Sequence, residues 1–164
     1  MEMIYIAKYL RAIFLLFSLY VILASVAKAD YIPGIITVQD TRDHIIGYIT
    51  TNGEVMDENY NLIGYIRENG SIEGSNSASI GYFDGRNFQD DKFNIIGYFA
   101  GNRLANINFY TLGYIGDGRI EGQNYLTVGY FNGNTGGNDW VIAAFCLYYT
   151  DMFHHSKIQK EPLK

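Results

Sequence analysis

Cysteine, proline and histidine are scarce in this sequence of 164 residues, which has one, two and three of them. The single cysteine, Cys146, excludes a disulfide within the chain, so packing must hold the fold together. Because Cys146 lies in an apolar stretch, we expect a buried, unreactive thiol. The histidines are His44, His154 and His155, and none stands at zinc-site spacing from another histidine or the cysteine. We therefore expect neither a metal nor a cofactor.

Runs of basic residues and catalytic motifs are also missing. Lysine and arginine total 12 against 17 acidic residues, a net charge of -5, which disfavours nucleic acid as a partner. Neither a phosphate-binding loop nor a nucleophile elbow occurs, and we expect no enzymatic activity. The least favoured alternative is a cell-envelope hydrolase using paired carboxylates, drawn from Asp57, Glu58, Glu73, Asp90, Asp91 and Glu121.

The first 29 residues have the pattern of a signal peptide. Lys8 and Arg11 precede an apolar run at 12–24, and a small-residue segment ends at Ala29. We predict cleavage between Ala29 and Asp30, which would export the chain to the periplasm, the cell envelope or the medium. The mature chain would carry a formal charge of -7, with nine basic and sixteen acidic side chains.

A retained N-terminal segment is the alternative to cleavage. Residues 4–26 approach the roughly 20 residues that span a bilayer, and only in that case do we expect contact with a membrane. The predicted organisation is a signal peptide at 1–29, a repeat domain at 30–150 and a polar tail at 151–164.

Internal repetition dominates the sequence after the signal segment. An apolar residue, Gly, Tyr and a second apolar residue recur six times, with spacings of 17, 17, 16, 16 and 16 residues. The six tyrosines are Tyr48, Tyr65, Tyr82, Tyr98, Tyr114 and Tyr130. About five full units therefore lie between the first and last Gly-Tyr pairs, with a half unit at each end.

A glycine-containing pair follows each Gly-Tyr segment, and it predicts a hairpin turn of type I′ because Asn-Gly and Asp-Gly tolerate positive φ. These pairs are Asn52-Gly53, Asn69-Gly70, Asp84-Gly85, Gly101-Asn102, Asp117-Gly118 and Asn132-Gly133. A unit this short cannot bury its own apolar face, so the units must pack on one another, in a linear array or a closed ring. Closure would remove the exposed edges and account for the half units.

Strand alternation assigns faces to the repeat. The residue before Gly and the Tyr after it are expected on one face, and Gly with the next Ile or Phe on the other. The gap at Gly predicts that a backbone or a large ring approaches there, and the Ile or Phe of a neighbouring unit is a candidate to fill it. Since each Tyr would share its face with an aliphatic residue, we expect the tyrosines in the core, with an exposed aromatic binding face as the alternative.

The C-terminal segment changes character. Residues 140–149 are apolar almost all round and too short to cross a membrane. We predict a short buried helix that begins after Asp139, with a final strand as the alternative because aromatic and β-branched residues are frequent.

The chain resembles the small bacterial β-flower repeat proteins. The Gly-Tyr-Ile strands, the Asn-Gly and Asp-Gly turns and the C-terminal segment from Ala143 to Leu147 carry this likeness, which covers Ile35 to Tyr149. The resemblance implies an all-β fold of tandem hairpins closed around a pseudo-symmetry axis. It implies no activity or residue role.

These observations favour an exported, non-enzymatic structural or interaction module with a protein or glycan partner that the sequence does not identify. The alternative is a carbohydrate- or peptide-binding module that uses the face of the six repeated tyrosines. Exposure of those tyrosines would distinguish the two.

Overall fold

The computed structural model describes Ile32 and residues 34–153, and within them the chain forms twelve strands and one helix. The predicted signal peptide at 1–29 and the residues from His154 onward lie outside the described residues. The helix, α2, spans Trp140–Tyr148. The strands are β1 (Ile36–Asp40), β2 (Ile45–Ile49), β3 (Glu54–Asp57), β4 (Leu62–Ile66), β5 (Ser71–Gly74), β6 (Ser79–Phe83), β7 (Asn87–Asp90), β8 (Ile95–Ala100), β9 (Arg103–Asn106), β10 (Thr111–Gly116), β11 (Arg119–Gly122) and β12 (Thr127–Asn132).

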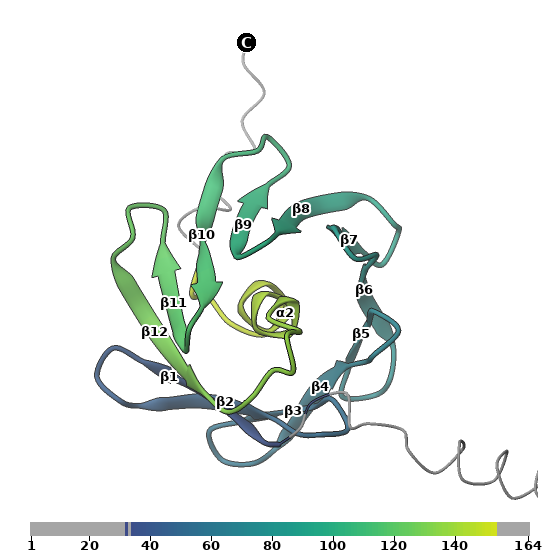
Figure 1. Ribbon diagram of the computed structural model, residues 1–164. Coiled ribbons are helices and arrows are strands. Elements are labelled where there is room, and N and C mark those ends of the chain that lie inside the picture. Colours follow the sequence, from purple (N-terminus) through teal and green to yellow (C-terminus); the bar gives the residue numbers. More distant parts are fainter. Residues whose placement is uncertain (1–31, 33, 154–164) are drawn as a thin grey trace, which may run out of the picture.

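The strands form a closed antiparallel barrel in which neighbours in sequence are neighbours in space. The ring closes where β12 pairs with β1, with Phe131 opposite Val38. The half units at the two ends of the repeat thus complete a sixth hairpin, and the predicted closure around a pseudo-symmetry axis is confirmed. Figure 1 shows the ring viewed along its axis, with helix α2 in the middle.

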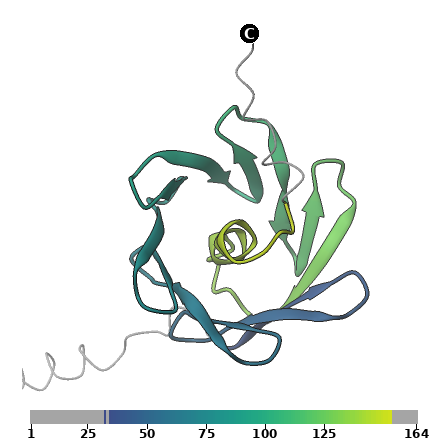
Figure 2. The same ribbon diagram turned by 180° about the vertical axis from the view of Figure 1, so that it is seen from behind.

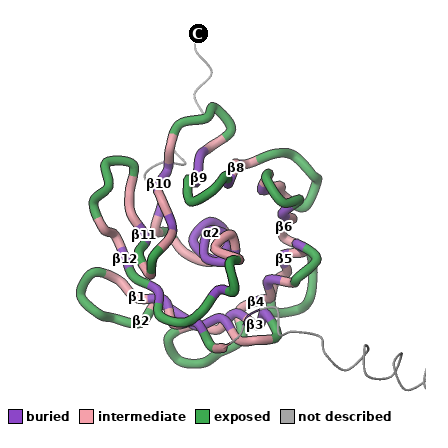
Figure 3. Tube along the Cα trace, viewed as in Figure 1, coloured by how far each residue is buried: buried purple, intermediate pink, exposed green. Residues whose placement is uncertain are grey.

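Two kinds of connection alternate around the ring. The glycine-containing turns lie close to the helix in Figure 1, whereas the other connections project outward. We call the outward connections petals; they are residues 41–44, 58–61, 75–78, 91–94, 107–110 and 123–126. In Figure 3 exposed residues gather on the petals, and buried residues lie on the strands and on α2.

The turns differ from the predicted type I′ in all but one case. Asp117 and Gly118 both have positive φ, at 52° and 76°, as that turn requires. In the turn after β2 only Gly53 has positive φ, and its amide donates to the carbonyl of Thr50 at 2.9 Å. The 17-residue units have this longer turn, so a left-handed glycine closes a wider loop there.

A β-bulge recurs at the residue before each Gly-Tyr pair. In β2, for example, Gly47 and Ile45 have partners on β1 and Ile46 between them has none. A bulge re-aims the side chain of the extra residue. The aliphatic residues at this position therefore pack against the core and do not share the tyrosine face, so that prediction was wrong; they are Ile46, Ile63, Ile80, Ile96, Leu112 and Val128.

Helix α2 fills the barrel, as Figures 1 and 2 show from opposite sides. Its residues from Val141 to Leu147 are all buried, which confirms the predicted helix over the alternative strand. A helix that is apolar all round needs apolar surroundings on every side. The ring provides them through one fully buried residue on each returning strand: Val38, Val55, Ile72, Phe88, Leu104 and Ile120.

The repeated glycine leaves room for side chains of the C-terminal segment. A Cβ added at Gly81 would lie 2.6 Å from Cζ of Tyr148. The prediction that a large ring approaches the glycine is confirmed, but the helix and the residues after it supply the side chain, not the Ile or Phe of a neighbouring unit. The contacts are Gly47 with Phe145, Gly64 with Tyr149, Gly81 with Tyr148, Gly113 with Phe153 and Gly129 with Met152.

Two hydroxyl groups fix the end of the helix to the barrel wall. Tyr148 donates to the carbonyl of Gln89 at 2.6 Å, and the Tyr149 hydroxyl lies 2.9 Å from the carbonyl of Tyr65 and 2.7 Å from that of Glu73. Burial raises the pKa of both tyrosines above its ordinary value. These phenols therefore stay protonated and act as donors inside the barrel.

Both ends of the C-terminal segment depart from the prediction in detail. Asp139 stands at the N-cap of α2, but its carboxylate accepts from the Thr135 hydroxyl at 2.6 Å and does not cap the helix. Met152 and Phe153 pack in or against the core, although the division at residue 150 places them in the tail. The packed part of the chain thus continues to Phe153.

Candidate functional site

The six repeated tyrosines lie on the outer face of the barrel. The glycine before each Tyr and the Ile or Phe after it are buried, so the tyrosine between them points away from α2. Exposure ranges from 8% at Tyr48 to 38% at Tyr130. Tyr48 is buried, whereas the other five are partly or largely exposed and lie outside the hydrophobic core cluster. The prediction that the tyrosines pack in the core was therefore wrong for these five, because the bulge moved the aliphatic neighbour inward and left the tyrosine on the outer face.

Three of these tyrosines stack on an aromatic residue of the next petal. The pairs are Tyr48 with Tyr60, Tyr98 with Phe109 and Tyr114 with Tyr125, each with ring centroids 4.5 Å apart and nearly parallel planes. The petal partners Tyr60, Phe109 and Tyr125 are 68%, 58% and 65% exposed. Each pair thus presents a large aromatic surface to solvent.

The petal aromatics occupy an unfavourable backbone conformation. Tyr60, Phe109 and Tyr125 have φ of 64°, 63° and 62°, in the left-handed region that glycine usually fills. This conformation costs a residue with a side chain about 1 to 2 kcal/mol. The third of the four residues in a petal is left-handed, which closes the loop. At the equivalent position of another petal, Ser77 has φ of 60°, so the loop does not depend on an aromatic ring.

The last strand residue before a petal holds the loop in shape. Asp57 accepts from the amides of Asn59 and Asn61 at 2.9 and 2.8 Å, and its other oxygen accepts from the Asn61 side chain. Asp90 makes the same set of bonds with Lys92 and Asn94. Hydrogen bonds from the asparagine side chain, then from the backbone, lower the pKa of both carboxyl groups.

Three of the six acidic residues of the hydrolase alternative have other contacts. Asp57 and Asp90 bind the amides of their own petals, and Glu73 forms an ion pair with Arg67 at 3.1 Å. Within residues 34–153, no group of three acidic, histidine or cysteine side chains gathers in a geometry that could hold a metal.

Two of the stacked pairs also join through their hydroxyl groups. The phenol oxygens of Tyr48 and Tyr60 lie 3.0 Å apart, as do those of Tyr114 and Tyr125. This bond is the main reason why the pKa of Tyr48 and Tyr125 is raised. It fixes the two rings in register, so the exposed surface is preorganised.

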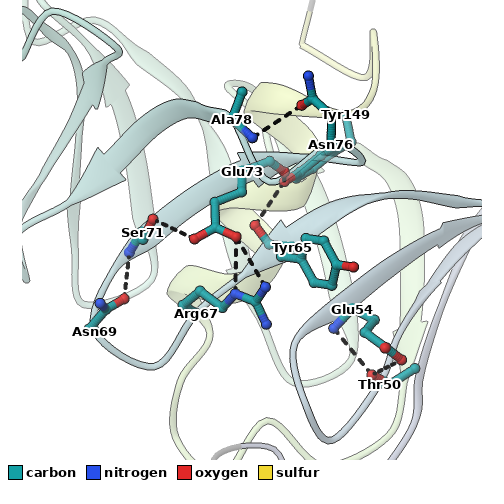
Figure 4. A network of polar contacts seen from close by, with 10 residues as sticks. All are labelled: Thr50, Glu54, Tyr65, Arg67, Asn69, Ser71, Glu73, Asn76, Ala78 and Tyr149. Atoms are coloured by element: carbon teal, nitrogen blue, oxygen red, sulfur yellow. Dashed lines mark hydrogen bonds and ion pairs between the residues drawn. The ribbon is translucent and has the colours of Figure 1, made fainter.

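Tyr65 has a cation over its ring in place of a petal aromatic. The guanidinium carbon of Arg67 lies 3.9 Å from the centroid of Tyr65, and its Nε and Nη2 donate to Oε2 of Glu73 at 3.2 and 3.1 Å. The Ser71 hydroxyl donates to the other carboxylate oxygen of Glu73 at 3.1 Å. Figure 4 shows this cluster together with Tyr149, whose hydroxyl bonds to the backbone carbonyls of Tyr65 and Glu73.

A cavity of about 240 Å³ lies on the same outer face beside Tyr114. Its walls combine an aromatic ring, two acids, a guanidinium and an amide; they are Asn102, Tyr114, Gly116, Asp117, Arg119 and Glu121. A second hollow, of about 400 Å³, lies at the start of α2 beside Trp140, which stacks on Phe83.

The sequence interpretation named the repeated tyrosines but missed their petal partners. The signal was present: an aromatic residue follows the repeated tyrosine by 11 or 12 positions at Tyr60, Phe109 and Tyr125. It was hidden because the petal position varies, with Asp43 and Ser77 in other units, and because an aromatic residue is not expected at positive φ.

Cys146 and His44 do not belong to the aromatic surface. Cys146 is buried beside Met152, with the two sulfur atoms 3.7 Å apart, and burial raises the pKa of its thiol. His44 lies in a petal, 3.5 Å from the carboxylate of Asp40. None of the helices in the described part of the chain is long and apolar enough to cross a bilayer.

Comparison with known proteins identifies the repeat. Residues 36–149 match the family described as 5-fold beta-flower protein. Searches of curated proteins and of solved structures found no match. The matched residues span the whole barrel and helix α2, and in this chain the ring contains six hairpins. The chain is a member of the beta-flower family.

Proposed function

We propose that this protein is an exported, non-enzymatic interaction module that binds its partner through the outer aromatic surface of the petals. The observation that supports this most is the set of three stacked pairs, in which Tyr60, Phe109 and Tyr125 remain mostly exposed at positive φ. Strained backbone persists where the surrounding structure compensates for it, and such residues gather at functional sites.

The architecture fits this role. A barrel filled by α2 is a rigid support, and binding residues are commonly carried on loops held by a rigid framework. Tyrosine is favoured at interfaces because its ring is large and its hydroxyl hydrogen-bonds. The predicted signal peptide would bring the surface to an envelope or external partner of protein or glycan nature.

The test replaces the three petal aromatics by serine, the residue found at the equivalent Ser77. The triple variant carries Tyr60→Ser, Phe109→Ser and Tyr125→Ser, and Phe93→Ser is the matched control, since Phe93 is exposed at the same petal position but forms no aromatic stack among the described contacts. Binding to immobilised glycans and peptides is measured for each protein.

We expect the wild type and the control to bind the same ligands and the triple variant to lose binding, with unchanged thermal unfolding. Equal binding by the triple variant would contradict the proposal, as would a wild type that binds no member of either collection.

A further inference from the structure

The cluster around Tyr65 shows how this surface holds a cation. Tyr65 lies directly opposite Glu73 in the β4–β5 hairpin. The guanidinium of Arg67 lies over the ring of Tyr65 and donates two hydrogen bonds to the carboxylate of Glu73. The aromatic ring and the carboxylate thus bind the same planar cation. Aromatic faces attract cations, and hydrogen bonds to a carboxylate are strengthened by its charge.

The β10–β11 hairpin repeats this arrangement without the arginine. Tyr114 lies directly opposite Glu121, in the register of Tyr65 and Glu73. The residue two positions after the tyrosine is Arg67 in one hairpin and Gly116 in the other. Gly116 has no side chain, so the space that corresponds to the guanidinium of Arg67 belongs to the cavity beside Tyr114.

Tyr114 is partly accessible from the cavity. Tyr125 stacks on Tyr114 and bonds to its hydroxyl, but Tyr125 is not among the cavity walls. Tyr114 therefore borders the cavity with a part that Tyr125 does not cover. A Cβ at Gly116 would meet only Cβ of Asn102, at 3.8 Å, so the space is open.

We propose that the cavity beside Tyr114 binds the guanidinium group of an arginine side chain from a peptide or protein partner. The arginine would stack on Tyr114 and donate to Glu121, as Arg67 does with Tyr65 and Glu73. This inference rests on the proposed function and assigns one subsite and one ligand chemistry to it.

The charges of the cavity agree with this ligand. Asp117 and Glu121 contribute two negative charges against one positive charge from Arg119. Neither acid forms an ion pair in the part of the chain that the structure describes. The side-chain amide of Asn102 adds an acceptor for a guanidinium N–H. Strand addition is unavailable, because every described strand already has a neighbour on both sides, so a peptide must be recognised through its side chains.

The experiment titrates the mature protein with acetyl-Gly-Arg-Gly-amide, and with the same peptide carrying citrulline, by calorimetry and by nuclear magnetic resonance. Citrulline keeps the shape of arginine but has no charge. We expect binding of the arginine peptide at one site and affinity at least about tenfold lower for citrulline, because a charge-assisted bond is lost.

Two variants test the location of the arginine site: one fills the cavity, and the other opens an equivalent space elsewhere. Gly116→Arg would fill the cavity from within and should abolish binding while it leaves the fold intact, because a Cβ at this position makes only an ordinary van der Waals contact with Cβ of Asn102. Arg67→Gly would open the equivalent space over Tyr65, and should raise the number of bound peptides from one to two.

Absence of arginine binding by the wild type would overturn the inference, and so would equal binding of citrulline or unaltered binding by Gly116→Arg. Any of these results is compatible with a glycan bound on the stacked pairs, which the serine variants of Tyr60, Phe109 and Tyr125 test separately. Failure of the subsite is thus distinguishable from failure of the proposed function.

Discussion

Gly81 is a repeated glycine that has almost no space for a side chain. An added Cβ would lie 2.6 Å from both the carbonyl oxygen of Gln89 and Cζ of Tyr148. We expect Gly81→Ala to lower the free energy of unfolding by about 1 to 3 kcal/mol, the usual cost of overpacking. Urea unfolding followed by fluorescence of Trp140, the single tryptophan, measures the effect.

Gly34→Ala is the control for this measurement, because no atom lies within 4 Å of a Cβ at Gly34. A Gly81→Ala protein as stable as the Gly34→Ala protein would show that the helix shifts to make room and that the glycine is not required by packing.

A petal is the element whose stability depends on acid. Hydrogen bonds from Asn94 lower the folded-state pKa of Asp90 below its ordinary value of 3.8. A carboxyl group with a lowered pKa stabilises the fold above the unfolded pKa of about 3.9, and this contribution is lost as pH falls through the folded pKa. We expect Asp90→Asn to lose less stability than the wild type between pH 6 and pH 2.

Asn106 provides the precedent for this substitution. Its side-chain oxygen accepts from the amides of Asn108 and Tyr110 at 2.9 and 3.0 Å, the same bonds that Asp90 makes. The petal should therefore form with asparagine at neutral pH. Parallel acid unfolding curves for the variant and the wild type would contradict the assignment of this contribution to Asp90.

The hairpins were the most predictable elements. Regular glycine spacing and turn residues specify short-range hairpins, and the apolar half units specified the closure. The bulge before each Gly-Tyr pair was not predictable from alternation, since an extra residue in a strand looks like an ordinary one in sequence. The recurring bulge reversed the expected place of Ile46 and its equivalents, and it placed the repeated tyrosines on the outer face, where Tyr48 alone is buried.

Only one part of the candidate surface, the six repeated tyrosines, was predictable from the sequence. The six tyrosines carry a fixed spacing, but their contacts depend on which side chain the following petal presents and on a left-handed backbone that sequence rules reserve for glycine. The sequence likewise gives no sign that Arg67 and Gly116 matter to this surface. Their meaning appears only when the register places Tyr65 opposite Glu73 and Tyr114 opposite Glu121.

The proposed export concerns the whole molecule, and the mass of the protein from its native host tests it. Ile32 is buried in the core, so a cut between Ala29 and Asp30 would leave the packed chain complete. We expect the protein recovered from its native host to begin at Asp30 and to be found outside the membrane fraction. A full-length species in that fraction would contradict export as a free module.

Because β1 pairs with β12, the ring would close in nearly the same way if the chain began at another point of the repeat. All other strand pairs join segments adjacent in sequence, so only this pair joins strands from the two ends of the repeat. Local pairings form early, whereas a distant pairing must wait for the ends to meet. The five glycine-containing turns occupy the position in the ring that the seam between β1 and β12 occupies, and they are five near-equivalent places for such a break. Gene rearrangements that rotate the order of units could therefore carry a petal to a new position relative to the termini while the barrel around α2 keeps its form.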